Sequence, residues 1–276
     1  MDKKNPKIIT FASIKGGVGK STSSILFATL LARKYTVLLI DMDTQASVTS
    51  YFFNEIKEKN INLMEKNVCE VLKGNLELAS AIFNIEGSLD LLPSYLTLHS
   101  LNEDFYCANR HKSIDLKLKV ELRRLKIKYD YIVIDTNPSL DFTLKCSLNS
   151  TDYIIVPMTA EKWTLESYEL LEFFIKKLDR LIPIFFIITR FKKNNTHKKL
   201  LKIIQEKDTF LGVVSERENL NKRIASNSDF DLKSDYIIEY NQILSNLLYH
   251  INLSDDTMEI PSISCPALEN YKNPIE

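Results

Sequence analysis

A glycine-rich loop near the start of the chain has the composition of a phosphate-binding loop. It consists of eight consecutive residues, namely Lys15, Gly16, Gly17, Val18, Gly19, Lys20, Ser21 and Thr22. Glycines let the backbone turn tightly and point successive N–H groups at phosphate oxygens, and a following helix adds the positive end of its dipole. In such loops the lysine before the hydroxyl residue, here Lys20, reaches the β- and γ-phosphates, while Ser21 binds Mg²⁺. The loop therefore predicts a site for ATP and Mg²⁺.

The loop departs from the common phosphate-loop pattern at its first position. The pattern G-x-x-x-x-G-K-[ST] has glycine where this chain has Ile14, and an additional lysine, Lys15, follows directly. Lys20 already serves the phosphates of its own subunit, so Lys15 is not expected to fold back on them. Lys15 could instead reach phosphates held by a neighbouring subunit.

Three aspartates come at the ends of short apolar runs. Asp41 and Asp43 follow one run, and Asp135 ends another. In a parallel sheet such positions lie at the edge where ligands bind. We expect Asp135 to hold Mg²⁺ through water, with Ser21 and Asp41 as further candidate metal ligands, and one of Asp41 and Asp43 to orient the attacking water. A lone aspartate at a strand end is equally often a cap or turn residue, so the hypothesis depends on all three occurring with the loop.

The elements that must position these residues alternate along the chain. Short runs rich in Ile, Val and Leu, which lack polar alternation, lie at 8–14, 37–40, 89–92, 131–134, 153–156, 184–188 and 211–214. Helical patterns lie at 20–33, 63–72, 116–126, 164–181, 198–206 and 235–251. This alternation predicts an α/β fold with a mostly parallel central sheet flanked by helices. We expect one ATPase domain over residues 1–254 and an irregular tail at 255–276.

The composition is that of an ordinary globular protein without a strong overall field. Lys and Arg total 36 and Asp and Glu total 36 in 276 residues, so binding to nucleic acid must depend on a local basic patch. The four cysteines are scattered, which argues against a zinc site. No apolar run is long enough to span a bilayer. We therefore expect a cytoplasmic protein.

Three stretches of the chain resemble the motifs of ParA/Soj-type partition ATPases, the deviant Walker A group that also includes MinD. They are the loop at 15–22, Asp-Met-Asp-Thr-Gln at 41–45 and Ile-Asp-Thr-Asn-Pro-Ser-Leu at 134–140. The resemblance extends from about Lys7 to at least Val214. It implies a P-loop NTPase fold and weak ATPase activity.

The resemblance also implies roles for individual residues. It implies an ATP-sandwich dimer in which Lys15 contacts the nucleotide of the partner subunit. Lys20 and Ser21 would bind phosphate and Mg²⁺. Asp43 would position the hydrolytic water, and Asp135 would be the second acid of the metal shell. In this family the ATP-bound homodimer binds DNA without sequence specificity, and a ParB-type partner stimulates hydrolysis and releases it. The resemblance thus implies association with the nucleoid.

Two positions depart from the pattern of the family. Thr44 stands where the family usually has proline after the second aspartate of D-x-D, and Asn137 replaces the first proline of Asp-x-Pro-Pro. Both loops should therefore be less stiff. This bears on the rate of hydrolysis more than on nucleotide binding.

Candidate contacts to DNA and to the base lie late in the chain. Arg217, Lys222 and Arg223 fall where the family places its DNA contacts, and their cations would neutralise phosphates regardless of sequence. The alternative is a solvated helix face, which is what most charge runs are. By the same resemblance, Thr189 and Arg190 lie where the family contacts adenine.

Two other functions stay open at this point. The chain could be a MinD-like or cargo-positioning ATPase that uses another surface than DNA. It could also be a regulatory DNA-binding dimer in which ATP only sets dimerisation. The prolines and acidic residues of the tail argue against the basic amphipathic helix by which MinD-like proteins bind membranes, so no membrane partner is expected.

Overall fold

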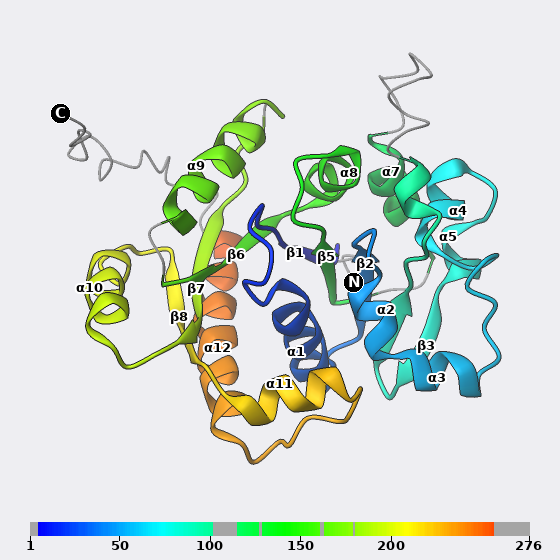
Figure 1. Cartoon of the computed structure of the whole chain (residues 1–276). Coiled ribbons are helices and arrows are strands. Elements are labelled where there is room, and N and C mark those ends of the chain that lie inside the picture. Colours follow the sequence, from blue (N-terminus) through cyan, green and yellow to red (C-terminus); the bar gives the residue numbers. More distant parts are fainter. Residues whose placement is uncertain (1–4, 102–114, 127–128, 161–162, 179, 257–276) are drawn as a thin grey trace.

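Residues 5–101, 115–126, 129–160, 163–178 and 180–256 are described by the computed structural model (Figure 1). Their strands form one eight-stranded sheet in the order β3-β4-β2-β5-β1-β6-β7-β8. Neighbouring strands are parallel, apart from the antiparallel edge pair β3 and β4. The predicted α/β fold with a mostly parallel sheet is therefore confirmed.

The strands are short and mostly buried. They are β1 (Lys7–Phe11), β2 (Val37–Met42), β3 (Phe83–Glu86), β4 (Leu89–Leu92), β5 (Tyr131–Thr136), β6 (Tyr153–Thr159), β7 (Ile184–Phe191) and β8 (Phe210–Ser215). All residues of β2 and β5 are buried, as expected for central parallel strands covered on both faces.

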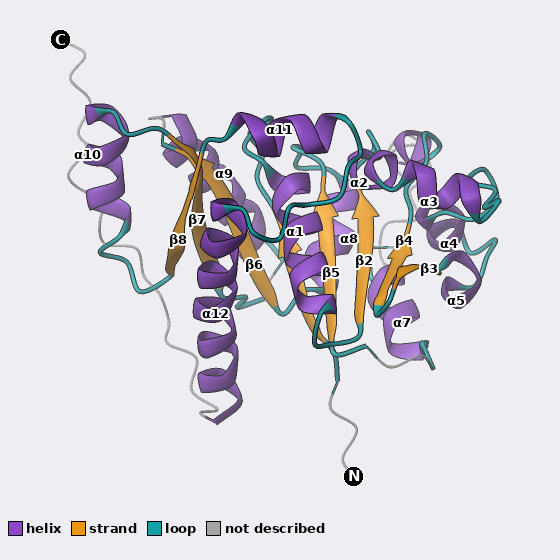
Figure 2. Cartoon of the chain, turned by 90° about the horizontal axis from the view of Figure 1, so that it is seen from below, coloured by secondary structure: helices purple, strands orange, loops and turns teal. Residues whose placement is uncertain are grey.

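Helices cover both faces of the sheet. They are α1 (Lys20–Ala32), α2 (Ser47–Tyr51), α3 (Phe53–Glu58), α4 (Val68–Lys73), α5 (Leu78–Ala81), α7 (Lys117–Arg124), α8 (Phe142–Ser150), α9 (Trp163–Lys176), α10 (Asn195–Ile204), α11 (Glu218–Ala225) and α12 (Asp235–Asp256). One core joins α1 and α12 to the sheet, and two further cores pack α7, α8 and α9 on the opposite face. Figure 2 shows these two layers, with α2 and α11 lying across the carboxyl edge of the strands.

The structure corrects several predicted boundaries. The first strand ends at Phe11 and not at Ile14, because the loop begins there. Strand β3 was not predicted, since its four residues alternate in burial too briefly to give a pattern. Helix α8 was missed because it is buried almost all round and so lacks an amphipathic period.

The C-terminal boundary also differs from the prediction. The irregular tail was expected from Asp255, but α12 continues through Asp256. The rest of that tail, 257–276, lies outside the described residues. The extent of the single domain, 1–254, stays a prediction.

Candidate nucleotide-binding site

The glycine-rich loop joins β1 to α1 at the carboxyl edge of the sheet. Gly17 and Gly19 have φ values of +74° and +80°, in the left-handed region that residues with a Cβ avoid. Helix α1 begins at Lys20, and its N-cap residue, Gly19, offers no side-chain cap. An uncapped helix start behind a turn of glycines is the arrangement that binds phosphate oxygens through backbone N–H groups.

The loop is supported from strand β7, which is separated from β1 by β6. The hydroxyl of Thr189 donates to the carbonyl of Val18 over 2.7 Å, and both residues are buried. A Cβ built on Gly19 would lie 3.8 Å from the Thr189 side chain, which is ordinary contact. Thr189 therefore braces the loop, a role that the sequence did not suggest.

Arg190, the other residue predicted to lie near the base, directly follows this brace. Its φ of +50° is unusual for a residue with a side chain, and the residue is exposed at the end of β7. The contact of Arg190 with the nucleotide base stays a prediction.

Lys20 lies among the acidic residues of the site. Its side chain is 6% exposed, and Nζ lies 3.4 Å from the carbonyl oxygen of Lys15. Burial lowers the pKa of Lys20, while the charges of Asp135 and Asp43 raise it in part. A desolvated ammonium that is held by nearby carboxylates is well placed to bind phosphate once a nucleotide enters. Lys15 itself lies half-buried at the start of the loop.

Asp135 is a buried carboxylate suited to binding a cation. It is fully buried, and neither carboxylate oxygen has a hydrogen-bond partner of normal geometry among the described residues. Burial, with the charges of Asp41 and Asp43, raises the pKa of Asp135 to about 8, whereas Ser21 and Lys20 act in the opposite direction. Because Ser21 influences the pKa of Asp135, the two side chains lie close together.

Ser21 and Asp135 fit a magnesium ion bound together with a nucleotide. Mg²⁺ takes oxygen ligands and usually binds through one or two protein groups, water and phosphate. In the described part of the chain, no group of three or more His, Cys, Asp and Glu side chains is placed to hold a metal alone. A magnesium ion held by Ser21 and Asp135 would take its remaining ligands from phosphates and water.

Asp41 is engaged in a different set of contacts. Its Oδ2 accepts hydrogen bonds from the N–H and the hydroxyl of Thr49, at 2.8 and 2.7 Å. Its Oδ1 accepts the N–H of Asp43 at 3.0 Å. Burial, opposed by these bonds, raises the pKa of Asp41 to about 7. Asp41 thus shapes the loop after β2, and its predicted role as a metal ligand stays a prediction.

Asp43 lies at the same edge of the sheet. In the pairing of β2 with β5, Asp41 is opposite Asp135, so the aspartates of the two strands meet as expected. Asp43 is 5% exposed; its Oδ1 accepts the N–H of Gln45 at 2.8 Å and its carbonyl accepts the hydroxyl of Ser94 at 2.8 Å. The structure therefore brings Lys20, Ser21 and the three aspartates into one site.

The candidate DNA contacts form a separate group at α11. Arg217 precedes this helix, and its guanidinium donates to Glu239 of α12 over 2.8 Å. Glu239 also accepts the N–H and hydroxyl of Ser215. Arg217 therefore ties the start of α11 to α12, a contact that the sequence did not reveal and that competes with binding to DNA.

The other two cations of this group, Lys222 and Arg223, make contacts with nearby residues of the chain. Lys222 pairs with Glu218 over 2.8 Å one turn earlier, and both side chains are more than 70% exposed. The guanidinium of Arg223 donates to the carbonyl of Asp229. Exposed pairs of this kind contribute little to stability, so the Lys222 ammonium is readily available to a phosphate.

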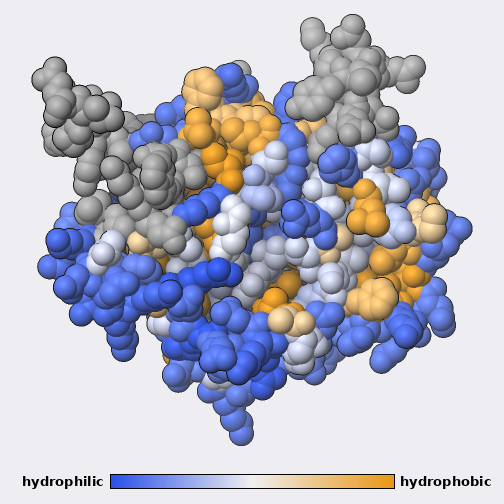
Figure 3. Space-filling view, viewed as in Figure 1, coloured by the Kyte–Doolittle hydropathy of each residue, from blue (hydrophilic) through white to orange (hydrophobic). Residues whose placement is uncertain are grey.

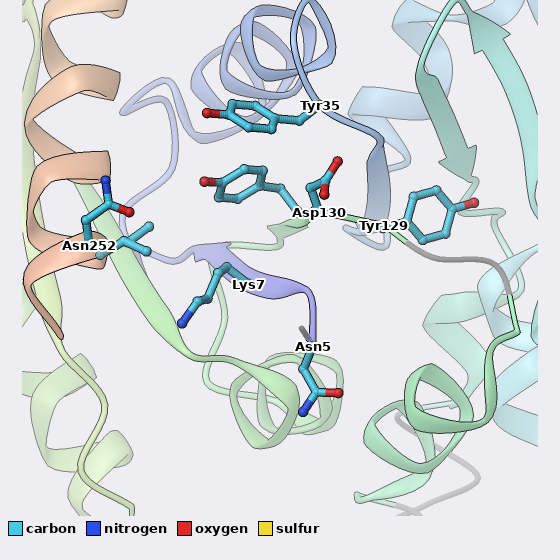
Figure 4. A pocket seen from close by; sticks show the side chains of 8 residues that line it. Asn5, Lys7, Tyr35, Tyr129, Asp130 and Asn252 are labelled. Carbon is cyan, nitrogen blue, oxygen red and sulfur yellow. The ribbon is translucent and has the colours of Figure 1, made fainter. Parts of the chain in front are cut away.

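A cavity of about 130 Å³ lies elsewhere, at the amino edge of the sheet (Figure 4). Its lining includes Lys7, Tyr35, Asp130 and Tyr131. It contains none of the residues of the loop or the strand-end aspartates. It is therefore separate from the candidate nucleotide site.

The loop, the buried lysine and the strand-end aspartates define a P-loop NTPase with a deviant Walker A motif. A family model described as an AAA domain matches residues 6–184, and the chain belongs to that family. Within it, the chain is a ParA-type member of the MinD/ParA superfamily. None of the described helices is long and apolar enough to cross a membrane.

Known proteins agree with this assignment. A plasmid partition protein of Borrelia burgdorferi B31, solved with bound AMPPNP, is 57% identical, with a TM-score of 0.85 over 89% of this chain and 100% of the other. A virulence plasmid ParA family protein of Chlamydia psittaci is 28% identical over 72% of this chain and 75% of its own length. An uncharacterized protein of Methanocaldococcus jannaschii is 34% identical over 59% of this chain, which spans 63% of that relative.

Proposed function

We propose that this chain is an ATP-dependent partition ATPase. ATP binding would drive sandwich dimerisation and non-specific binding to DNA, and slow Mg²⁺-dependent hydrolysis, stimulated by a ParB-type partner, would reset the dimer. The similarity to a plasmid partition protein with bound AMPPNP supports this function. The observation that carries it is a continuous set of contacts from the nucleotide site to α11.

The first part of this connection joins the D-x-D loop to α2. Thr49 lies in the middle of α2 and donates two hydrogen bonds to the buried Asp41. Its hydroxyl also accepts the N–H of Ser94 at 2.8 Å. Because these groups are buried, a shift of the loop that holds Asp43 must move α2 or break hydrogen bonds.

The second part joins α2 to the segment that directly follows α11. The side-chain amide of Asn227 donates to the carbonyl of Ser50 over 2.8 Å, and the hydroxyl of Tyr51 donates to the carbonyl of Ser228 over 3.0 Å. The ring of Tyr51 also stacks on Phe230, with centroids 5.5 Å apart. These contacts link segments that are about 177 residues apart in the chain.

The connection gives ATP a route to the candidate DNA surface. Contacts of Asp43 with a nucleotide would shift α11 through this connection. Helix α11 carries Lys222 and Arg223 and lies across the carboxyl edge of the sheet (Figure 2). A two-state shift of α11 would then make DNA binding depend on the bound nucleotide.

The face that carries the nucleotide loop also has features suited to a second subunit. Figure 3 views this face and shows apolar surface over α9 beside it, where Leu170 and Phe173 are 54% and 59% exposed. An exposed apolar patch of this kind often marks a protein–protein contact. A second copy placed on this face would bring its Lys15 toward the nucleotide of the first.

Hydrolysis in such a dimer would depend mainly on positioning and charge. Bound Mg²⁺ supplies neutralisation of the charge on the β- and γ-phosphate oxygens. Lys20 would bind those oxygens, Ser21 and Asp135 would orient the metal shell, and Asp43 would orient the water. Slow turnover is expected until a partner protein improves this arrangement.

A DNA-retention assay tests the proposed function. Fluorescence anisotropy of a labelled random-sequence duplex is measured at low salt with Mg²⁺ and ATP, ADP or no nucleotide. We expect tight binding with ATP alone, weakening steeply as salt rises. The Asp43→Ala protein should remain on the DNA because it keeps its ATP. Equal retention in all three nucleotide states would overturn the proposal and favour the cargo-positioning alternative, which uses another surface than DNA.

A further inference from the structure

A side chain beside the predicted water-orienting aspartate has an unused hydrogen-bond acceptor. Asn137 follows β5 directly and is 4% exposed. Its amide oxygen, Oδ1, has no hydrogen-bond partner among the described residues. Buried polar atoms are nearly always paired, so an unpaired one indicates a missing partner such as a water or a ligand.

The orientation of this amide is determined by its neighbour. The Nδ2 group of Asn137 donates to Oδ2 of Asp141 over 2.6 Å. A carboxylate only accepts hydrogen bonds, so the nitrogen must face Asp141 and the oxygen must face away. Asp141 is itself fixed, because its Oδ1 caps α8 by accepting the N–H of Leu144 at 3.1 Å and the hydroxyl of Thr143 at 2.7 Å.

The register of the sheet places Asn137 next to Asp43. Strand β2 pairs with β5 so that Asp41 is opposite Asp135 and Met42 is opposite Thr136. Asp43 and Asn137 each come directly after the last paired residue of two neighbouring strands, whose backbones lie about 5 Å apart. Both are buried, at 5% and 4% exposure.

We propose that Oδ1 of Asn137 positions the attacking water together with Asp43. The inference rests on the proposed hydrolysis of ATP and adds a second acceptor to it. With one hydrogen directed to Asp43 and the other to Asn137, a lone pair of the water points toward the γ-phosphate.

The chemical step itself involves no proton transfer to Asn137. The water oxygen forms a bond to the γ-phosphorus while the bond from that phosphorus to the β,γ-bridging oxygen breaks, which yields ADP, inorganic phosphate and one proton. Asn137 is therefore a positioning residue. The proline that the family usually has at this place offers no side-chain acceptor, so this contribution would distinguish the present chain.

The test compares three variants of the full-length protein. Asn137→Ala removes the acceptor and also the contact with Asp141. Thr143→Val is the matched control, because it removes a different side-chain hydrogen bond to Asp141 and leaves Asn137 in place. Asn137→Asp combined with Asp141→Asn reverses the polarity of the hydrogen bond between the two residues. It restores an acceptor oxygen at position 137 and retains an effective helix cap.

The expected result is a separation of kcat from KM. Loss of one hydrogen bond in the transition state should lower kcat of Asn137→Ala roughly tenfold with KM and ATP affinity unchanged. Thr143→Val should keep the wild-type kcat, and the double variant should recover most of it. Equal losses in Asn137→Ala and Thr143→Val, or no loss in Asn137→Ala, would overturn the inference.

A crystal structure with AMPPNP and Mg²⁺ gives a second readout that does not depend on turnover. We expect a water within hydrogen-bond distance of both Asn137 Oδ1 and Asp43, on the γ-phosphate side. An Oδ1 that faces protein or lacks this water would contradict the inference even if ATP is hydrolysed. If the wild-type protein hydrolyses no ATP, the proposed function fails, and this structure still decides whether Asn137 holds a water.

Discussion

The contact between Thr49 and Asp41 predicts a large loss of stability when one hydroxyl is removed. Thr49→Val preserves the shape of a side chain that is 3% exposed. It removes a donor that lies 2.7 Å from Asp41 Oδ2 and an acceptor that lies 2.8 Å from the N–H of Ser94. The substitution therefore disturbs two buried hydrogen bonds while creating almost no cavity.

The magnitude follows from what each lost bond leaves behind. Above pH 7, where Asp41 is mostly ionised, a hydrogen bond to it contributes about 1.5–3 kcal/mol, and a buried N–H without a partner costs about 1–3 kcal/mol. Asp41 still accepts the N–H of Thr49, so the lower half of the combined range applies. We expect the free energy of unfolding to fall by about 3 kcal/mol, a substantial part of the roughly 5–15 kcal/mol of an ordinary domain.

Urea denaturation of the nucleotide-free protein measures this loss. The control is Thr49→Ser, which keeps the hydroxyl and loses only a methyl group, at about 1 kcal/mol. A valine variant as stable as the serine variant would show that the two hydrogen bonds of the hydroxyl contribute little, because the loss would then come from packing. In that case the α2 connection to α11 would lose its physical basis.

Three further predictions address the metal site, the loop and α11. The pKa of Asp135 in the nucleotide-free protein is raised to about 8, so this carboxyl is mostly protonated at pH 7. Mg²⁺ binds the ionised carboxylate, and binding of Mg·ATP at pH 7 should therefore release about one proton. Calorimetry in buffers of different ionisation enthalpy measures that proton, and Asp135→Asn should abolish its release; identical enthalpies for the wild type would contradict this. Gly19→Ala should weaken ATP binding through strain of about 1–2 kcal/mol at a φ of +80°, and unchanged affinity in a titration would refute the strained-loop explanation. Arg217→Ala should lower the free energy of unfolding by about 1–2 kcal/mol through loss of its ion pair. Lys222→Ala should leave stability intact and reduce the salt dependence of DNA binding by about one charge. If denaturation and salt titration gave the reverse pattern, Arg217 would be the DNA contact and Lys222 the stabilising residue.

The parts of the site that depend on local sequence could be predicted. Glycine spacing identifies the loop and the start of α1 at Lys20, whereas the end of the preceding strand was predicted three residues too late. The carboxyl ends of parallel strands share one edge, and this rule alone places Asp41 near Asp135.

Contacts between distant segments could not be predicted. The bond from Asn227 to Ser50 spans 177 residues, and nothing in the local pattern of either segment indicates it. The same holds for Thr189, which braces the loop over 171 residues. Arg217 shows the converse, since the resemblance implied a contact with DNA, whereas its guanidinium pairs with Glu239 on another helix. A single sequence encodes such pairings only through the complete fold.

In the proposed function ATP assembles two subunits through Lys15, and analytical ultracentrifugation measures that assembly. The Asp43→Ala protein, expected to retain ATP, is compared with the double variant that also carries Lys15→Ala. Nucleotide affinity is measured for both. We predict that the first sediments as a dimer with Mg·ATP and as a monomer with ADP, and that the second binds ATP but stays a monomer. A double variant that dimerises as well as its parent would contradict the account.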